Sequence, residues 1–164
     1  MAIRRGRGHR LEVTCGMAGL EVCCSISVRQ TVVSDISDIL NMDDASQWPP
    51  RAAKLRRAAE KGRCYVIAGA GPVIGFALLH YHFFDHGFIE LLIVAKEHRQ
   101  RGHGSTLLEA LKKTCTTAKL FTSTNLSNAP MHRLLAKCGF VRCGYIDMLD
   151  EGDPEIVYCF ERMP

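Results

Sequence analysis

One stretch decides how this chain folds: residues 89–94 read IELLIV, and residues 99–104 read RQRGHG. The first half lies within Phe88–Ala95 and is typical of a buried strand, because apolar residues run together and only Glu90 interrupts them. The second half is a glycine-rich turn. A helix is predicted after it, because one face carries apolar residues at helical spacing: Leu107, Leu108, Leu111, Cys115 and Ala118.

The turn between this strand and this helix has the composition of a phosphate-binding loop. A helix N-terminus presents unpaired backbone N–H groups and the positive end of the helix dipole. Gly102 and Gly104 leave those groups open to a phosphate, and Arg99 and Arg101 add positive charge. No Gly-Lys-Ser/Thr follows, so the loop is not a Walker loop. The residues alone also permit an ordinary glycine-rich turn with solvated arginines.

Working outward, the hydrophobic pattern predicts a mixed α/β fold in the order β-α-α-β-β-β-α-β-α-β-β. Strands are expected at 25–28, 64–68, 73–84, 88–95, 120–124, 140–147 and 156–160, and helices around 36–40, 51–61, 105–118 and 128–138. Ser34 and Asp35 are expected to cap the first helix. The glycines of residues 69–75 do not match the dinucleotide fingerprint, so Gly69–Pro72 is predicted to be a hairpin turn.

Composition indicates one soluble globular domain. The chain has 164 residues, of which 47% are hydrophobic and 23% are charged. These values exclude a largely disordered or collagen-like chain, and the length fits one domain. The longest nearly unbroken apolar run, Phe88–Ala95, is too short to cross a bilayer, so no membrane partner is expected.

The N-terminal segment differs from the rest of the chain. Of the net charge of +4, about +3 belongs to residues 1–16, which carry four arginines against Glu12. The remainder is nearly neutral, which gives little support to nucleic-acid binding. Residues 1–23 lack a secretory apolar stretch and are predicted to be a disordered extension, with Met17 as an alternative start and an organellar presequence left open. The folded domain is expected to span residues 24–164.

Eight cysteines raise the question of disulfides or zinc: Cys15, Cys23, Cys24, Cys64, Cys115, Cys138, Cys143 and Cys159. There is no Cys-x-x-Cys pair, which zinc sites usually need. Most of these cysteines lie in apolar runs, where a free thiol behaves as a small hydrophobic side chain. Reduced core cysteines and a cytoplasmic location are therefore expected.

Three ordered motifs resemble the GNAT N-acetyltransferase superfamily. Residues 89–94 resemble its fourth strand, and Arg99–Gly104 is similar to its Arg/Gln-x-x-Gly-x-Gly/Ala acetyl-CoA loop. Residues 128–131 and 134–140 resemble its Asn-containing segment and the following helix that ends in Gly-Phe. The resemblance covers about residues 25–162, and the order and spacing of the motifs agree with the family.

This resemblance implies acetyl-CoA as cosubstrate. The pantetheine arm would lie along the end of the fourth strand, whose backbone would also polarise the thioester carbonyl. The diphosphate would lie on the amides of residues 100–105. The cofactor-binding residues implied in this way are Leu92, Ile93, Val94, Arg99, Gln100, Arg101, Gly102, His103, Gly104, Ser105 and Asn128. Asn128 is equally suited to cap a helix, and the two roles are compatible.

Glu90 is the candidate general base. A free ammonium cannot attack a thioester, and a carboxylate acting through water can take its proton. A charge in an apolar strand is costly unless it is solvated or paired, and Glu90 matches a position where some family members carry their base. Strand alternation predicts that Glu90 shares a face with Leu92 and Val94. The alternative is a carboxylate paired with a neighbouring basic residue, such as His80 or His82.

The general acid departs from the family pattern. Many members carry a tyrosine four residues before the Gly of Gly-Phe, where it protonates the leaving thiolate. Here that residue is Leu135, which cannot donate a proton. Tyr145, Ser127 and Cys138 are the candidate replacements, with assistance from water as the other option. Tyr145 also suits a plain strand residue, and Cys138 a core residue.

The remaining polar clusters permit further interpretations. His80, His82 and His86 favour a hairpin-end group near the acceptor site over a metal site. The acidic first helix suits either a cationic acceptor or a solvated face. Acceptor choice is expected to depend on the first two helices and the loop Asp147–Glu155.

The sequence thus predicts an N-acetyltransferase that moves an acetyl group from acetyl-CoA to a primary amine by direct attack. The acceptor is left open between a small amine, an amino-acid-like metabolite, and a protein N-terminus or lysine. Because of Leu135, a non-catalytic acyl-CoA-binding or regulatory module is the main alternative. A nucleic-acid-associated protein that uses the arginine-rich segment is a weaker one. A homodimer is compatible with the sequence but not specified by it.

Overall fold

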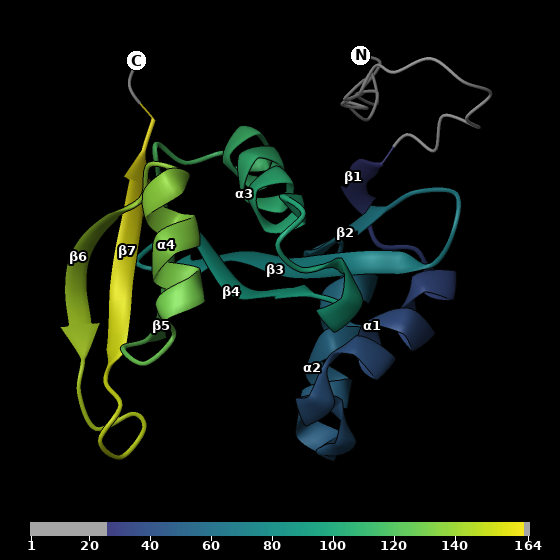
Figure 1. The fold of residues 1–164 in the computed structure, drawn as a ribbon, viewed down its shortest axis with the longest axis horizontal. Helices are drawn as coiled ribbons and strands as arrows, with labels where there is room; N and C mark the ends of the chain where they lie inside the picture. The colour runs from purple at the N-terminus through teal and green to yellow at the C-terminus, as the bar shows by residue number, and fades with distance from the viewer. Residues whose placement is uncertain (1–25, 163–164) are drawn as a thin grey trace, which may run out of the picture.

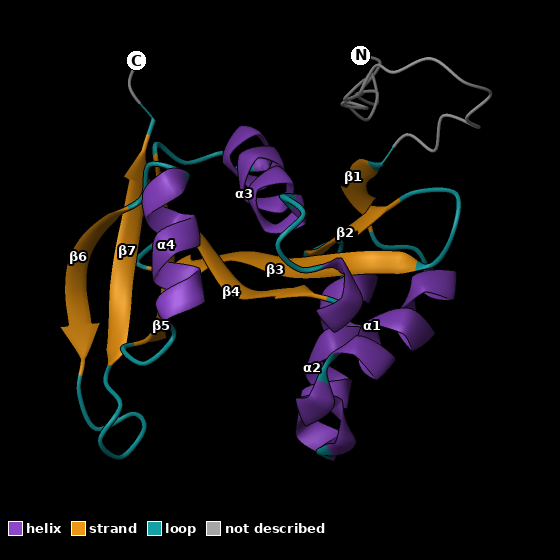
Figure 2. Ribbon diagram, in the orientation of Figure 1, coloured by secondary structure: helices purple, strands orange, loops and turns teal. Residues whose placement is uncertain are grey.

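The computed structural model describes residues 26–162, which form seven strands, four α-helices and three short 3₁₀ turns (Figures 1 and 2). The strands are β1 (Ser27–Gln30), β2 (Cys64–Ala68), β3 (Val73–Phe83), β4 (His86–Val94), β5 (Lys119–Asn125), β6 (Val141–Ile146) and β7 (Glu155–Glu161). The helices are α1 (Ile36–Met42), α2 (Pro49–Glu60), α3 (His103–Thr114) and α4 (Ala129–Lys137). The predicted element order is confirmed. The extension predicted for residues 1–23 lies outside the described residues.

All seven strands belong to one sheet in the order β1-β2-β3-β4-β5-β7-β6. Every neighbouring pair is antiparallel except β4 and β5, which are parallel. A parallel neighbour needs a crossover connection, and α3 provides it between these two strands. The fold is therefore the mixed α/β arrangement that the sequence predicted, with the only parallel step of the described sheet at its centre.

The helices cover the two faces of the sheet in pairs. α3 and α4 lie on one face and α1 and α2 on the other (Figure 1). Leu107, Leu108 and Leu111 of α3 are fully buried in the first layer. Ile39 of α1 and Leu55 of α2 are 2% exposed and pack against the opposite face. Burial of each such side chain stabilises the fold by about 1.5–3 kcal/mol, so both faces of the central strands are held by apolar packing.

The start of α1 differs from the expected cap. Asp35 occupies the N-cap position but makes no capping bond from its side chain. Its carboxylate instead accepts hydrogen bonds from the Arg29 guanidinium at 2.6 and 2.9 Å and from the Val32 amide at 2.8 Å. The Arg29 guanidinium lowers the pKa of Asp35 below its usual range. A charged hydrogen bond to a neighbouring strand is stronger than a neutral cap, which explains why Asp35 ties α1 to β1.

Five described cysteines are free thiols. Cys64, Cys115, Cys138 and Cys159 are buried, as expected for core cysteines, whereas Cys143 is exposed on β6. Burial raises the pKa of the Cys64 thiol to about 11, so it stays protonated and unreactive at neutral pH. Cys15, Cys23 and Cys24 lie outside the described residues. None of the helices between residues 26 and 162 is long and apolar enough to cross a membrane.

Candidate active site

β4 and β5 diverge at the centre of the sheet. They pair only where Gly87–Ile89 lies beside Leu120–Thr122, although β4 continues to Val94 and β5 to Asn125. A cavity of about 180 Å³ lies between the diverging ends, lined by both strands, by Asn128 and Met131 at the start of α4, and by Glu155 of β7. Along this edge, the described part of β4 has no strand partner after Ile89, so its backbone groups can bind a ligand.

A β-bulge in β4 places Glu90 at the point of divergence. Leu78 of β3 faces Leu91 and Leu79 faces Ile89, so Glu90 is an additional residue without a partner in β3. Ile89 therefore packs towards α3 and α4, while Leu91 packs towards α1 and α2. The bulge interrupts the alternation of side chains.

The prediction that Glu90 shares a face with Leu92 and Val94 is wrong for this reason. Leu92 and Val94 pack on the α3/α4 face, whereas the side chain of Glu90 reaches α2. Its Oε1 accepts a hydrogen bond from Nζ of Lys54 at 2.6 Å. The sequence did not identify Lys54, because helical periodicity does not tell which strand a helix crosses.

His80 is the second neighbour of Glu90. Its Nε2 lies 4.0 Å from Oε2 of Glu90, and its Nδ1 accepts a hydrogen bond from the His82 amide. A neutral imidazole that accepts at Nδ1 carries its proton on Nε2, so this N–H faces the carboxylate. Burial lowers the pKa of His80, and this effect is larger than the opposing effect of Glu90. The ring is therefore neutral at pH 7. His82 instead faces Arg63, with 2.9 Å between its Nε2 and Nη1 of Arg63.

The loop before α3 has the geometry of an anion site. Gly102 is the N-cap of α3 at φ +88°, with no side-chain capping bond, and a Cβ there would meet no atom within 4 Å. Gln100 also has a positive φ, of 61°. Arg99 donates from Nε to the Val94 carbonyl at 2.9 Å, which ties the loop to the end of β4. The first-turn N–H groups of α3 are thus left without intrahelical acceptors, and they suit a phosphate.

Gly104 has a packing role besides the one predicted. A Cβ at this position would lie 2.9 Å from Cδ2 of Leu134 on α4 and 3.8 Å from Cδ2 of Leu92 on β4. Gly104 therefore allows α3 to pack closely against α4, in addition to leaving its own amide open. Leu92 also lies near this position, so the start of α3 adjoins the diverging end of β4, as the predicted cofactor site requires.

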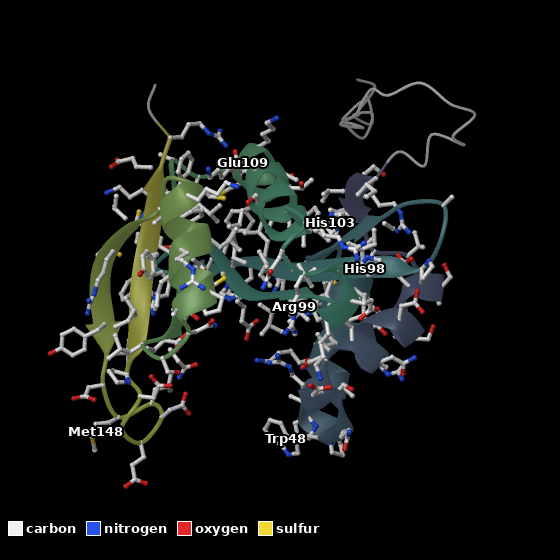
Figure 3. All side chains as sticks on the ribbon, in the orientation of Figure 1. Trp48, His98, Arg99, His103, Glu109 and Met148 are labelled. Carbon is white, nitrogen blue, oxygen red and sulfur yellow. The ribbon has the colours of Figure 1, made fainter. Side chains whose placement is uncertain are left out.

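The polar side chains of the loop spread outward from the helix start. His98, Arg99 and His103 gather where β4 ends and α3 begins (Figure 3). Burial lowers the pKa of His103, and the neighbouring His98 and Arg101 lower it further, so its ring is neutral at pH 7. His103 thus contributes no full charge. Arg101 is exposed and Ser105 is half-buried in the first turn of α3.

Asn128 begins α4 beside the cavity. Its Oδ1 accepts a hydrogen bond from the Met131 amide at 3.3 Å, and its Nδ2 donates to Oγ1 of Thr124 at 2.9 Å. The predicted capping role is confirmed. Because Asn128 also lines the gap between β4 and β5, the structure keeps the predicted cofactor contact open.

The structure does not bring the candidate proton donors together with Glu90. Tyr145 lies on edge strand β6 and is 66% exposed, and it does not line the central cavity. Ser127 donates from Oγ to Oδ2 of Asp153 at 2.6 Å. Cys138 and Leu135 are buried in the α3/α4 core. The side chain at the family's tyrosine position is therefore an apolar core residue.

The histidines do not form a metal site. Within residues 26–162, no group of three His, Cys, Asp or Glu side chains is arranged to hold a metal ion. His80 and His82 instead stack on one face of the β3–β4 hairpin, with ring centroids 5.5 Å apart.

The comparisons with known proteins agree with this geometry. Residues 33–140 match the model of the acetyltransferase (GNAT) family, and this match covers the diverging strands and the loop before α3. The chain belongs to the GNAT acetyltransferase family. No curated protein matches it.

Solved structures share the GNAT fold over most of their length. A GNAT acetyltransferase from Bacillus cereus is 32% identical, with a TM-score of 0.79 over 85% of this chain and 99% of that one. Ard1 from Thermoplasma volcanium is 19% identical, with a TM-score of 0.72 over 85% and 99% of the two chains. A putative acetyltransferase from Salmonella typhimurium, solved with its cofactor acetyl-CoA, is 18% identical, with a TM-score of 0.67 over 83% and 93%.

Proposed function

We propose that this GNAT protein is an N-acetyltransferase that moves the acetyl group of acetyl-CoA to a primary amine by direct attack. The observation that carries the proposal is the position of Glu90. A bulge holds its carboxylate where β4 and β5 diverge, beside unpaired backbone groups on one side and an open cavity on the other. Direct transfer of the acetyl group to an amine requires that the base lie next to the site that binds the acetyl group.

The residues present fit acetyl-CoA. The amides of residues 100–105 would bind the diphosphate, because Gly102 leaves the helix start open. The backbone of Leu92, Ile93 and Val94 would pair with the pantetheine arm, and Asn128 would face that arm from α4. The Salmonella relative, whose structure contains acetyl-CoA, supports this assignment through its shared fold.

Bound acetyl-CoA would supply an activated acetyl thioester, and the chain would supply the base. Glu90 would take the ammonium proton through a water molecule, which leaves a neutral amine able to attack. Nζ of Lys54 lies 2.6 Å from Oε1 of this carboxylate and holds it in place. An N–H group of β4 beyond the bulge would polarise the thioester carbonyl. Leu135 offers no proton, so water would protonate the leaving thiolate; Tyr145 has no role in this proposal.

The test is amine-dependent release of coenzyme A. Purified protein is incubated with acetyl-CoA and a panel of primary amines, and coenzyme A is measured by chromatography, because eight protein thiols would disturb a thiol reagent. We expect equal amounts of coenzyme A and N-acetylated product. Saturable acetyl-CoA binding without release on any amine would contradict the proposal and favour a non-catalytic acyl-CoA-binding module, which the buried Leu135 would suit. The cytoplasmic location stays a prediction.

A further inference from the structure

The α1/α2 face contains a second and larger cavity, of about 540 Å³, between α2 and the β3–β4 hairpin. We call it the basic groove. α2 and its C-cap residue line the groove with side chains at helical spacing. The small side chains of Ala53 and Ala58 leave space. The positive charge comes from Lys54, Arg57 and Lys61. Arg63 adds a fourth cation, and Glu90 closes the end nearest the diverging strands.

The basic groove has an uncompensated positive charge. Four lysine and arginine side chains line it against one carboxylate, Glu90, which is already paired with Lys54 at 2.6 Å. Among the described side chains, the Arg63 guanidinium has one polar contact, with the ring nitrogen of His82. Within residues 26–162, no carboxylate lies within 4.0 Å of the guanidinium or ammonium groups of Arg57, Lys61 or Arg63. Three cations therefore face the cavity without an acidic partner.

The cosubstrate does not account for these cations. The proposed diphosphate site is the N-terminus of α3, and α3 packs on the opposite face of the sheet. Three cations without an acidic partner lie on the acceptor side of Glu90. Together they create an electric field that attracts an anion.

The acidic residues near α1 do not offset this field. The structure engages each of them with a partner of the chain: Asp35 with Arg29, Asp38 with the Val73 amide, Asp43 with Arg51, and Asp44 with Lys96. Three of these carboxylates are thus paired with a cation, whereas Asp38 accepts from an amide and keeps its negative charge. The cations without an acidic partner gather instead in the basic groove.

We propose that the acceptor is a small molecule that carries an acidic group, a carboxylate or a phosphate, as well as the amine that is acetylated. This inference rests on the proposed acetyl transfer. The acidic group binds Arg57, Lys61 and Arg63, and the amine lies at Glu90. Lys54 and Lys61 are seven residues apart on one helix, which corresponds to about 10 Å, so amine and acid separated by about 5–10 Å fit the groove.

The transfer balances without a further reactant. The amine nitrogen bonds to the acetyl carbon as the carbon–sulfur bond breaks, and coenzyme A leaves as a thiolate. The ammonium proton passes through water to Glu90 and then to solvent, and the second proton, which the nitrogen loses after its attack, passes through water to the thiolate. The cations of the groove take no part in these bond changes; they hold the acidic end of the acceptor so that its amine lies near the carboxylate.

Acceptors with matched carbon skeletons test the charge preference. We compare 5-aminopentanoate, pentylamine and 1,5-diaminopentane for the carboxylate, and phosphoethanolamine with ethanolamine for the phosphate. We expect kcat/KM at least about tenfold higher for the better acidic amine than for its neutral counterpart, because hydrogen bonds to charged groups are strong. The diamine is expected to be the poorest, and added salt is expected to reduce the preference. Equal rates for neutral and acidic amines would overturn the inference.

Substitutions locate the preference in the groove. The double variant Arg57→Gln, Lys61→Gln should lose at least about tenfold in kcat/KM for the preferred acidic amine, and less for its neutral counterpart. Arg56→Gln is the matched control, because this exposed arginine belongs to the same helix but does not line the cavity. Equal losses in the control and the double variant would contradict the assignment.

A binding measurement separates this inference from the proposed function. Titration calorimetry with pentanedioate and with inorganic phosphate reports anion binding without any transfer. We expect saturable binding of at least one anion to the native chain and its loss in the double variant. If an anion binds but no amine is acetylated, the proposed acetyl transfer is wrong and the assignment of the basic groove as an anion site is retained. Absence of anion binding overturns the groove assignment even if neutral amines are acetylated.

Discussion

The two faces of the central sheet offer different chemical groups to a ligand. On the α3/α4 face, packing is apolar around Leu107, Leu108 and Leu111, and the groups offered to a ligand are backbone amides at the start of α3. On the α1/α2 face, charged side chains of α2 surround a cavity. Backbone amides suit a ligand common to a whole family, because they do not depend on residue identity. Side chains suit a ligand specific to one member.

The largest expected effect comes from Glu90, the residue where the two faces meet. Glu90→Gln preserves shape and removes the base, so we expect kcat at pH 7 to fall about a hundredfold or more. The affinity for acetyl-CoA should stay unchanged, because its proposed contacts are with backbone groups of β4 and of the loop before α3 and not with the Glu90 carboxylate. Steady-state rates and acetyl-CoA titrations measure the two quantities.

Glu60→Gln is the control for this prediction. Glu60 is an exposed carboxylate at the end of α2 that does not line the basic groove, so its loss should leave the rate unchanged. An unaltered rate in Glu90→Gln would remove Glu90 from the mechanism. A parallel loss of acetyl-CoA affinity would show that the two faces are not separate.

A second prediction tests the backbone recognition of the α3/α4 face. Gly102→Ala places a Cβ on a residue with φ +88°, which costs about 1–2 kcal/mol and shifts the loop. We expect the acetyl-CoA Kd to rise about tenfold, because the amides lose their alignment with the diphosphate. A thermal-shift titration with acetyl-CoA provides the measurement.

Gly152→Ala is a matched control, because Gly152 has φ +73° and equally open surroundings in the loop between β6 and β7. Both variants should lose similar stability, but only Gly102→Ala should lose affinity for acetyl-CoA. Equal affinities in the two variants would mean that the loop before α3 does not bind the cosubstrate.

The smallest expected effect concerns the acidic residues of the α1/α2 face. Asp35→Asn removes the ion pair with Arg29 and should lower the free energy of unfolding at pH 7 by about 1 kcal/mol, since Arg29 is partly solvated. The pKa of Asp35 is lower in the folded chain than in the unfolded one. Its contribution is therefore present above about pH 4 and is lost as the pH falls through the folded value.

Asp44→Asn is the control, because the pair between Asp44 and Lys96 is largely exposed and should contribute almost nothing. Urea unfolding at pH 7 and at pH 3 measures both variants. A native-minus-variant difference for Asp35→Asn that does not decrease between pH 7 and pH 3 would contradict the assigned role of its carboxylate.

Much of the fold could be predicted from the sequence, because the deciding interactions are local. Helical spacing of apolar residues defined α3 and α4, and the glycines at 102 and 104 defined the loop before α3. The prediction failed for the face of the sheet on which the Glu90 side chain lies. The bulge that turns this side chain towards α2 depends on how β4 pairs with β3, and strand alternation in one segment contains no information about a partner strand.

What the sequence determined by itself is the family, the order of the elements and the glycine-rich loop before α3. Each depends on residues close together in the chain, where the separation in sequence fixes the distance in space. The tertiary structure alone decided that Lys54 would meet Glu90, that the acidic residues near α1 would be engaged internally, and that Arg57, Lys61 and Arg63 would face one cavity. The physical reason is that charge acts through space. Which charges cancel and which remain depends on contacts between segments far apart in the sequence.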